Sequence, residues 1–519
     1  MLTIRNLSLY LSKDLRPLLN DFTFTLLPGM KAALIGEEGN GKSALLKAIA
    51  DPKSTADFLE IEGEIQTGGE IIGYLPQVFP CGVLAQSTKQ FLDRQKEGLF
   101  FDYTHFYTLL AKMQFPKERI SSTIKMGQLS GGEKIKFYLL CEMLKRPGVL
   151  LLDEPSNDLD LEAVEWLENF ILRLEIPLMF VSHDEMLLEK CADTIIHLEQ
   201  LVRKSRPQHA IANLPYSTYI QNRQDRIIKQ TQLAKKEKEE YDAKMARYRQ
   251  IYERVHHEQN VVSRQAPSVA KNLKDKMRSV KAMGRRFARE KEEMTARPDF
   301  EAGIELSFAE NISIPNGKLI LDLDLPALKA GNLVLSRDLK LRVFGPKKIC
   351  IVGANGSGKT TFLRQILQHL AENGIPYGYM PQDYNEILAP GINAVDFLSK
   401  SRKKEEITRA RTYLGSLNFT AAEMFHPVFE LSGGQQAKLC FAKMILDQAE
   451  VLVLDEPTRN LSPLSGPAIR EALKEFGGCI IAVSHDRKFI KEVFDQVMLL
   501  DESGLEIISF PLEDEKLET

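Results

Sequence analysis

The chain has 519 residues, which is too long for one hydrophobic core and suggests three or four domain-sized units. Its composition, 44% hydrophobic and 27% charged with a formal net charge of −3, is ordinary for a globular protein. The six cysteines lie far apart, which excludes the paired spacing of zinc or iron–sulfur sites and is typical of reduced thiols in a cytosolic protein.

The first predicted element is a strand at residues 1–14, where apolar and polar side chains alternate. This segment lacks the apolar core of a signal peptide. No apolar run in the chain approaches the roughly 18 residues that are needed to span a bilayer. We therefore expect a cytoplasmic protein without a membrane-spanning part.

A phosphate loop of the pattern Gly-x-x-x-x-Gly-Lys-Ser/Thr occurs at 36–43 and again at 353–360. Each loop follows an apolar, strand-like run and precedes a helical pattern. In such a loop the backbone N–H groups surround phosphates, the Lys reaches the outer phosphates and the hydroxyl binds Mg²⁺. The candidate ATP-binding residues are Gly36, Gly39, Asn40, Gly41, Lys42 and Ser43 in the first loop, and Gly353, Asn355, Gly356, Ser357, Gly358, Lys359, Thr360 and Thr361 in the second.

The phosphate loops belong to an internal repeat. A Gly-Tyr-x-Pro-Gln motif ends at Gln77 and at Gln382, and Leu-Ser-Gly-Gly, Leu-Asp-Glu-Pro and Val-Ser-His-Asp also occur twice. One separation, 302 positions, relates three unrelated pairs: Ser130 and Ser432, Glu154 and Glu456, His183 and His485. This common offset indicates a duplicated domain, with a first copy at 1–215 and a second copy at 301–519.

In each copy a short apolar run ends in two adjacent acids, Asp153-Glu154 and Asp455-Glu456. Such a run predicts a buried parallel strand that delivers both carboxylates to the carboxyl edge of a sheet. There the Asp can hold Mg²⁺ through water and the Glu can polarise the attacking water. His183 and His485 each follow a second apolar run, 29 residues after the Glu. A lone His there is more often structural, but its repetition favours a contact with the γ-phosphate.

The Leu-Ser-Gly-Gly motifs predict a second kind of anion site. A Ser and two glycines before a helix expose several N–H donors at its positive end. Since each copy already has a phosphate loop, this site is useful if it completes the ATP site of the other copy. The candidate residues are Ser130, Gly131 and Gly132 in the first copy, and Ser432, Gly433 and Gly434 in the second.

Between the copies, residues 221–300 are basic, with 21 Lys and Arg against 12 Asp and Glu. Apolar residues follow the spacing of a coiled-coil seam from Tyr241 to Val255 and again from Leu273 to Phe287. A polar, Pro-containing stretch separates them. The pattern predicts an antiparallel helical hairpin at 216–300 with a tip loop at about 259–270.

The second arm of this hairpin is the more basic one. A charge run is usually only a solvated face, but confinement of the excess charge to one element favours a phosphate-rich partner such as folded RNA. The candidate RNA-binding residues are Lys271, Lys274, Lys276, Arg278, Lys281, Arg285 and Arg286.

Together the motifs resemble the ATP-binding-cassette (ABC) family, and they cover both copies almost end to end. The resemblance implies an α/β fold with two phosphate-loop ATPase domains, arranged head to tail in one monomer with two ATP molecules between them. It implies that Ser432 and Gly434 close the site of Lys42, and that Ser130 and Gly132 close the site of Lys359. It also implies Mg²⁺ ligands and an adenine-stacking aromatic, the latter being Tyr10, which is nearly as well explained as a core residue. The implied Mg²⁺ ligands are Ser43, Gln77 and Asp153 in the first copy, and Thr360, Gln382 and Asp455 in the second.

Two such domains joined by a charged helical segment resemble the ABC-F family of ribosome-associated translation ATPases. This resemblance implies binding of the 70S ribosome at its exit site, with the hairpin near the 23S rRNA of the peptidyl-transferase centre and the peptidyl-tRNA. The stretch 455–465 places Ser462 where that family usually has Asp, and this version is similar to the Vga/Lsa/Sal branch that protects ribosomes from antibiotics. Further departures are Glu37 and Glu38 in the first phosphate loop, and Asp158 where the family usually has His.

Three alternatives stand beside this reading. A housekeeping ABC-F translation factor would show the same motifs. An ATPase subunit of a transporter explains the two copies but not the basic hairpin. A DNA-associated ATPase resembling the Uup group explains the charge but has a basic C-terminal extension, whereas residues 512–519 here are acidic.

Overall fold

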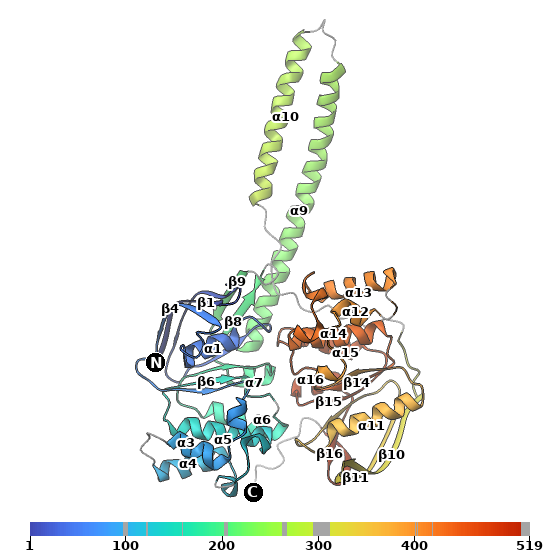
Figure 1. Ribbon diagram of the computed structural model, residues 1–519. Helices are drawn as coiled ribbons and strands as arrows, with labels where there is room; N and C mark the ends of the chain where they lie inside the picture. Colours follow the sequence, from blue (N-terminus) through green and yellow to red (C-terminus); the bar gives the residue numbers. More distant parts are fainter. Residues whose placement is uncertain are drawn as a thin grey trace. The chain divides into compact units, whose positions relative to one another are not determined.

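The computed structural model describes residues 1–96, 102–120, 123–157, 159–201, 206–261, 267–293, 312–399, 401, 403–417 and 419–509 (Figure 1). The chain divides into two compact units. One unit comprises residues 1–216 and 301–519 and therefore holds both copies of the repeat, and the other comprises residues 217–300. Asp158 and the acidic tail 512–519, which entered the sequence argument, lie outside the described residues.

The first copy is built on a six-stranded sheet in the order β5-β6-β7-β3-β8-β9. All neighbouring strands are parallel except β8 and β9, which are antiparallel. The strands are β3 Lys31–Ile35, β5 Ile72–Leu75, β6 Val149–Asp153, β7 Leu178–Val181, β8 Thr194–Gln200 and β9 Arg206–Ala212.

The second copy repeats this sheet strand for strand in the order β13-β14-β15-β12-β16-β17, again with only the last pair antiparallel. The strands are β12 Lys348–Val352, β13 Tyr377–Met380, β14 Val451–Asp455, β15 Cys479–Val483, β16 Gln496–Asp501 and β17 Gly504–Ile508. The predicted α/β fold with two phosphate-loop domains is confirmed.

An additional antiparallel sheet accompanies each six-stranded sheet, and here the copies differ. The first copy has three strands in the order β2-β1-β4, whereas the second has a two-stranded ribbon. The strands are β1 Leu2–Leu11, β2 Pro17–Leu26, β4 Leu59–Gln66, β10 Leu319–Ala330 and β11 Leu333–Phe344. The strand predicted at residues 1–14 is therefore present.

Four helices of each copy position the candidate site residues. They are α1 Lys42–Ala50, α5 Gly131–Leu144, α6 Leu161–Leu172 and α7 Glu185–Cys191 in the first copy, and α11 Lys359–Glu372, α14 Gly433–Leu446, α15 Gly466–Glu475 and α16 Arg487–Val493 in the second. Among the described residues of the two copies, the remaining helices are α2 Cys81–Leu84, α3 Thr88–Lys96, α4 Tyr103–Met113, α12 Ala394–Leu398 and α13 Lys404–Ser416, with short 3₁₀ turns at Lys117–Arg119, Met126–Gln128, Tyr384–Glu386, Glu423–Phe425 and Val428–Glu430.

Burial explains the central strands. All five residues of β6 and all five of β14 are buried, which is why both read as continuous apolar runs in the sequence. Because each run ends in Asp at the carboxyl edge of a parallel sheet, Asp153 and Asp455 are held by strands that are buried along their whole length. The core thus places one carboxylate beside each phosphate loop.

The second unit contains two helices, α9 Tyr216–Val261 and α10 Pro267–Glu293, which run side by side in Figure 1. Val255 packs with Met277 and Val280 in one buried cluster, and the ring of Tyr248 meets that of Phe287 edge to face. Helix covers 259–261 and 267–270 of the predicted tip loop, and residues 262–266 lie outside the described residues. Pro267 begins α10, a position where the missing N–H of proline costs nothing.

Within the part of the chain that the structure describes, no helix combines the length and the apolar character that crossing a bilayer requires.

Candidate active sites

The two phosphate loops have the same backbone geometry. Gly41 and Gly358 precede α1 and α11 with φ angles of 91° and 98°, in the left-handed region that glycine tolerates best. The loop then curls around its own lysine. Lys42 Nζ donates hydrogen bonds to the carbonyls of Gly36 at 2.8 Å and Glu37 at 3.0 Å. Lys359 Nζ donates to Gly353 and Ala354 at 2.7 and 2.9 Å, so each ammonium group lies inside its loop.

Beside each loop, a hydroxyl and a carboxylate meet as a Mg²⁺ site requires. Ser43 Oγ donates to Asp153 Oδ1 at 2.9 Å, and Thr360 Oγ1 donates to Asp455 Oδ2 at 2.7 Å. Among the described residues, no group of three or more His, Cys, Asp or Glu side chains is placed to hold a metal by itself. This donor set fits Mg²⁺, which is commonly bound by one or two protein oxygens together with water and substrate phosphates.

The first candidate base, Glu154, is held by a dense polar network. Its φ angle is 51°, a strained value that is typical of functional positions. Gln77 Nε2 donates to Glu154 Oε2 at 2.7 Å, and His183 Nε2 lies 3.1 Å from Glu154 Oε1. Burial by itself would raise the pKa of Glu154, but the hydrogen bond and charge of His183, with Lys42, lower it to about 2. Gln77, which the family resemblance makes a Mg²⁺ ligand, therefore contacts the base here.

The second candidate base, Glu456, has the same backbone strain, with φ again 51°, but a poorer network. It accepts a 3.3 Å hydrogen bond from the backbone N–H of His485, whose Nε2 lies 3.6 Å from Glu456 Oε1. Burial, reinforced by the charge of Asp455, raises the pKa of Glu456 to about 8. Burial, with the charge of Lys359, lowers the pKa of His485 to about 4. Among the described residues, Glu456 Oε1 and His485 Nδ1 are buried without a hydrogen-bond partner.

We call the Lys42 loop and the motif of Ser432 the first site, and the structure brings these two together across the copies. The backbone N–H of Gly434 donates to Glu38 Oε2 at 2.7 Å. Ser465 Oγ donates to Glu37 Oε1 at 2.9 Å, and Lys438 Nζ lies 3.7 Å from Glu37 Oε2. His183 Nδ1 is 2.8 Å from the carbonyl of Leu461, so the first site is closed by contacts between protein groups.

The second site, formed by the Lys359 loop and the motif of Ser130, is an open cavity of about 640 Å³. Gly131 and Lys134 of the first copy line it together with Lys359, Thr361, Gln382 and other residues of the second. The hydrogen bond between the copies at this loop is longer than those of the first site, since the backbone N–H of Asn355 donates to Asp160 Oδ2 at 3.5 Å. A cavity of this size, with lysine, hydroxyl and carboxylates converging, is suited to a nucleotide.

Three kinds of further candidate residue are the helix-capping serines, Asn40 of the first phosphate loop and Tyr10. Ser130 and Ser432 cap α5 and α14, each accepting a hydrogen bond from the third helical N–H at 3.2 and 3.3 Å. Asn40 is buried and donates to the carbonyl of Leu198 at 2.9 Å, so its side chain supports the loop from behind. Tyr10 is half-buried on β1, opposite Pro17 and Glu60 of the neighbouring strands.

The seven candidate RNA-binding residues all lie on α10 and are exposed. Arg278 forms an ion pair with Asp275 at 3.5 Å, and Arg286 with Glu290 at 3.2 Å. Five further basic positions along this helix, together with Arg278 and Arg286, leave a strongly cationic surface.

Sequence reasoning did not find the part that Glu37 and Glu38 have in closing the first site. Both were recognised as unusual acids in a phosphate loop, but their partners lie more than 390 positions away in the chain. Burial by itself would raise the pKa of Glu37. The charge of Lys438 and hydrogen bonds from Ser465 and Ser462 outweigh burial, so the pKa lies below its ordinary value.

Comparison with known proteins agrees with this geometry. Residues 19–157 and 336–459 match the family described as ABC transporter. The chain is 28% identical to the probable ATP-binding protein YheS of Escherichia coli K12, over 98% of this chain and 80% of that protein. It is 28% identical to ATP-binding cassette sub-family F member 3 of Homo sapiens, over 94% of this chain and 70% of that protein.

A solved structure described as a model of ribosome-bound archaeal Pelota and ABCE1 has the same fold. The match has a TM-score of 0.57 at 16% identity and covers 96% of this chain and 78% of that one. The chain thus defines a protein with two nucleotide-binding domains that meet at their phosphate loops. It belongs to the ABC transporter family, whose ATP-binding domain it carries twice.

Proposed function

We propose that this protein is an ATPase of the ABC-F type that acts on the ribosome. The observation that carries the proposal is the meeting of each phosphate loop with the Leu-Ser-Gly-Gly motif of the other copy. Gly434 N–H reaches the first loop at 2.7 Å, and Gly131 lines the cavity of the second loop. Because each site then needs both copies, ATP binding is coupled to the closure of one copy on the other.

The proposed chemistry follows from the groups at each site. Ser43 with Asp153, and Thr360 with Asp455, would hold Mg²⁺, which supplies charge neutralisation at the phosphates when bound. Glu154 and Glu456 would orient and polarise the attacking water, with His183 and His485 beside the γ-phosphate. The N–H groups at the starts of α5 and α14 would stabilise the same phosphate from the opposite copy.

The ribosome is proposed as partner because of the second unit. On α10, basic side chains at 271, 274, 278, 281, 285 and 289 recur every three or four residues and are exposed, so they form one stripe along the helix. Such a stripe suits the phosphates of folded RNA, here 23S rRNA or a peptidyl-tRNA at the exit site. Relatives in sub-family F and the ribosome-bound ABCE1 match in fold support this choice.

As a finer proposal, we infer that the protein protects ribosomes from an antibiotic. The supporting residue is Ser462, which replaces the usual Asp and lies buried at the contact between the copies, where it hydrogen-bonds Glu37. A housekeeping role in translation would use the same ATPase and the same stripe. The two roles differ in whether expression changes drug sensitivity.

The first experiment tests the ATPase and the ribosome together. Glu154→Gln with Glu456→Gln keeps the shape of both sites but removes the carboxylates, so the variant should bind ATP, fail to hydrolyse it and accumulate on ribosomes. Co-sedimentation with 70S ribosomes in ATP and in ADP measures this. Duplex DNA is the matched competitor. Equal sedimentation of the variant with both nucleotides, or preference for DNA, contradicts the proposal.

The second experiment separates protection from a housekeeping role. The wild-type gene and the double-Gln variant are expressed in a susceptible bacterium, and growth inhibition by a pleuromutilin, a lincosamide and a streptogramin A is measured. Protection predicts that the wild type raises the inhibitory concentration of at least one drug while the variant does not. No change for any drug, with ribosome binding intact, favours the housekeeping role.

A further inference from the structure

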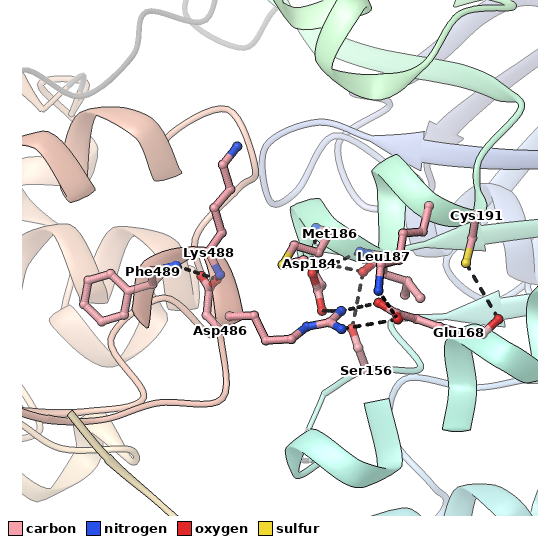
Figure 2. A network of polar contacts seen from close by, with 12 residues as sticks. Ser156, Glu168, Asp184, Met186, Leu187, Cys191, Asp486, Lys488 and Phe489 are labelled. Carbon is pink, nitrogen blue, oxygen red and sulfur yellow. Dashed lines mark hydrogen bonds and ion pairs between the residues drawn. The ribbon is translucent and has the colours of Figure 1, made fainter. Parts of the chain in front are cut away.

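A cluster of buried ion pairs joins the two copies through residues that do not belong to the phosphate loops. It is formed by α6 and α7 of the first copy and by α15 and α16 of the second. In Figure 2, Glu168 and Asp184 lie on the first copy, and Asp486 and Lys488 lie on the second. None of these side chains has a role in the ATPase chemistry proposed above.

Two arginine–glutamate pairs form the centre of the cluster. Arg487 binds Glu168 with both terminal nitrogens, one of them 3.2 Å from Glu168 Oε2. Arg470 Nη1 donates to Glu185 Oε1 at 2.6 Å. The two pairs join equivalent positions of the repeat. Glu168 and Arg470 are 302 positions apart, and so are Glu185 and Arg487. The first copy therefore has Glu at both positions, and the second copy has Arg at both.

The supporting charges are inverted in the same way. Within the first copy Lys190 Nζ lies 2.9 Å from Glu168 Oε2. Within the second copy, Glu492, which is again 302 positions further on, lies 2.6 Å from Arg470 Nε. Three equivalent positions thus carry opposite charges in the two copies, and Glu168 and Arg470 each have a counter-charge inside their own copy.

A neighbouring position shows that this inversion is selective. Asp184 and Asp486 are equivalent, and both are Asp because both cap a helix. Asp184 accepts hydrogen bonds from the N–H groups of Met186 and Leu187 at 2.8 and 3.1 Å, and Asp486 accepts two in the same way from α16. The residue is kept where local structure requires it, whereas the charge changes sign at 168/470 and 185/487, whose side chains contact the other copy.

Burial makes the sign of the charge decisive. Glu168, Glu185, Arg470 and Arg487 are exposed to 4%, 8%, 3% and 8%. A buried charge without a partner is strongly unfavourable, and like charges placed opposite each other are worse. If two first copies met through this surface, Glu168 would face Glu185 of the other chain. If two second copies met, arginines would face each other.

We infer that this surface is a charge code for the pairing of unlike copies. Its partner is the opposite copy of the repeat, and pairing of like copies from two chains is rejected. ATPase domains of identical sequence could pair with each other, because nothing in their surfaces distinguishes one domain from the next. Here the code leaves only the first-with-second combination, and the covalent connection within one chain makes that combination intramolecular.

The test exchanges the residues at this surface between the first and the second copy. The four equivalent pairs of positions are 168/470, 185/487, 186/488 and 190/492, with Lys488 included because its Nζ lies 2.7 Å from Glu185 Oε2. One half-exchange gives the first copy the residues of the second: Glu168→Arg, Glu185→Arg, Met186→Lys and Lys190→Glu. The other gives the second copy the residues of the first: Arg470→Glu, Arg487→Glu, Lys488→Met and Glu492→Lys. The full exchange combines all eight substitutions.

Each half-exchange places like charges at the contact, so the copies should separate. We expect a larger radius of gyration by small-angle scattering without nucleotide, and ATP turnover reduced by about tenfold or more. The full exchange should restore the radius and bring turnover to within about threefold of the wild type, since it rebuilds the same pairs with the signs reversed. Arg342→Glu, which replaces an exposed ion pair with Asp322 elsewhere by two like charges, is the control and should change neither quantity.

Mixing the two half-exchanged chains gives a second readout. Each alone has two faces of one sign, but together their faces are complementary, so a 1:1 complex should form by native mass spectrometry while neither chain pairs with itself. A full exchange that stays as open or as unstable as the half-exchanges overturns the inference, as does a half-exchange with an unchanged radius. Because the radius and the complex are measured without ATP, failure of the code is distinguishable from failure of the proposed ATPase.

Discussion

The two sites share one design but differ in what fills them. In the first site, Glu38 of the phosphate loop accepts the hydrogen bond from Gly434 N–H that a bound phosphate would be placed to accept. In the second site, the corresponding space is part of a cavity of about 640 Å³. Equivalent motifs therefore do not imply equivalent readiness for nucleotide, because one site presents its own anion to the donor.

The difference extends to the residue that faces each phosphate loop from the other copy. At the second site Asp160 faces the backbone of Asn355. At the first site the equivalent residue is Ser462, and the acid is instead Glu37 of the loop, which is bonded to Ser462 and Ser465. The second interface thus has its acid, Asp160, on the copy opposite the phosphate loop, whereas the first has Glu37 and Glu38 on the loop itself. Because Glu37 contacts Ser462 directly, we expect the two unusual residues to depend on each other.

The largest expected effect is a difference in ATP hydrolysis between substitutions of the two candidate bases, Glu456 and Glu154. If the open second site carries most of the turnover, Glu456→Gln should lower steady-state ATP hydrolysis by about 10²-fold or more, as loss of a positioned base does. Glu154→Gln should lower it by less than about tenfold, since the first site must first release Glu38. Phosphate release at saturating ATP measures both. Equal losses in the two single variants would mean that the sites work as equals.

The direct contact at the first site predicts a strong interaction between Ser462 and Glu37. Ser462→Asp places a buried carboxylate against Glu37 and should lower the free energy of unfolding by about 1–3 kcal/mol. Glu37→Ala in the same chain should remove most of that loss, because the like charge is gone. Urea unfolding of the two single variants and the double variant measures the coupling. Additive changes in the free energy of unfolding would contradict an interaction between Ser462 and Glu37.

Glu38 predicts an effect on nucleotide affinity. Glu38→Gln weakens the internal hydrogen bond to Gly434, a charge-assisted bond of about 1.5–3 kcal/mol, so part of that energy no longer opposes ATP. We expect ATP to bind the first site about tenfold more tightly, with the second site unchanged. Calorimetric titration in a Glu154→Gln, Glu456→Gln background resolves the two sites. Glu372→Gln, at the end of α11, is a matched control for the loss of one carboxylate. Unchanged affinity at both sites argues that Glu38 moves aside without cost.

The smallest expected effect concerns Glu168, which forms a buried ion pair with Arg487 at the contact between the two copies. Burial by itself would raise the pKa of Glu168, but Arg487 and Lys190 bond to it and lower the pKa below its ordinary value of 4.5. Asp184, 3.7 Å from Arg487, is the other acid at this contact. The stabilisation from Glu168 is therefore present above about pH 4.5 and is lost as the pH falls through the lowered value.

Urea midpoints at pH 7, 5 and 4 measure this effect, which we expect to reach about 1 kcal/mol. In Glu168→Gln the contribution of this carboxylate to the slope should disappear, although the variant is less stable at every pH. An identical pH slope in the wild type and in Glu168→Gln contradicts the assignment.

Much of this protein was predictable because its motifs are local. The loop around Lys42, the buried runs that end in Asp153 and Asp455, and the caps at Ser130 and Ser432 each depend on a few consecutive residues. Steric preference, burial and helix capping act at that range, so the residues indicate the geometry directly. The helical seam from Tyr248 to Phe287 was equally readable from spacing. The bounds of the tip loop at about 259–270 are wrong at both ends, since α9 continues to Val261 and Pro267 begins α10.

What the sequence by itself determined was the repeated α/β domain, the composition of each phosphate site and the basic character of the segment between the copies. The tertiary structure decided which groups meet across the copies: Glu38 with Gly434, and the inverted charges of Glu168 and Glu185 with Arg487 and Arg470. Those charges are visible in the sequence, but their signs acquire meaning only when residues about 300 positions apart are buried together. Desolvation is the reason, because it is burial that turns a tolerable surface charge into one that needs a partner of opposite sign.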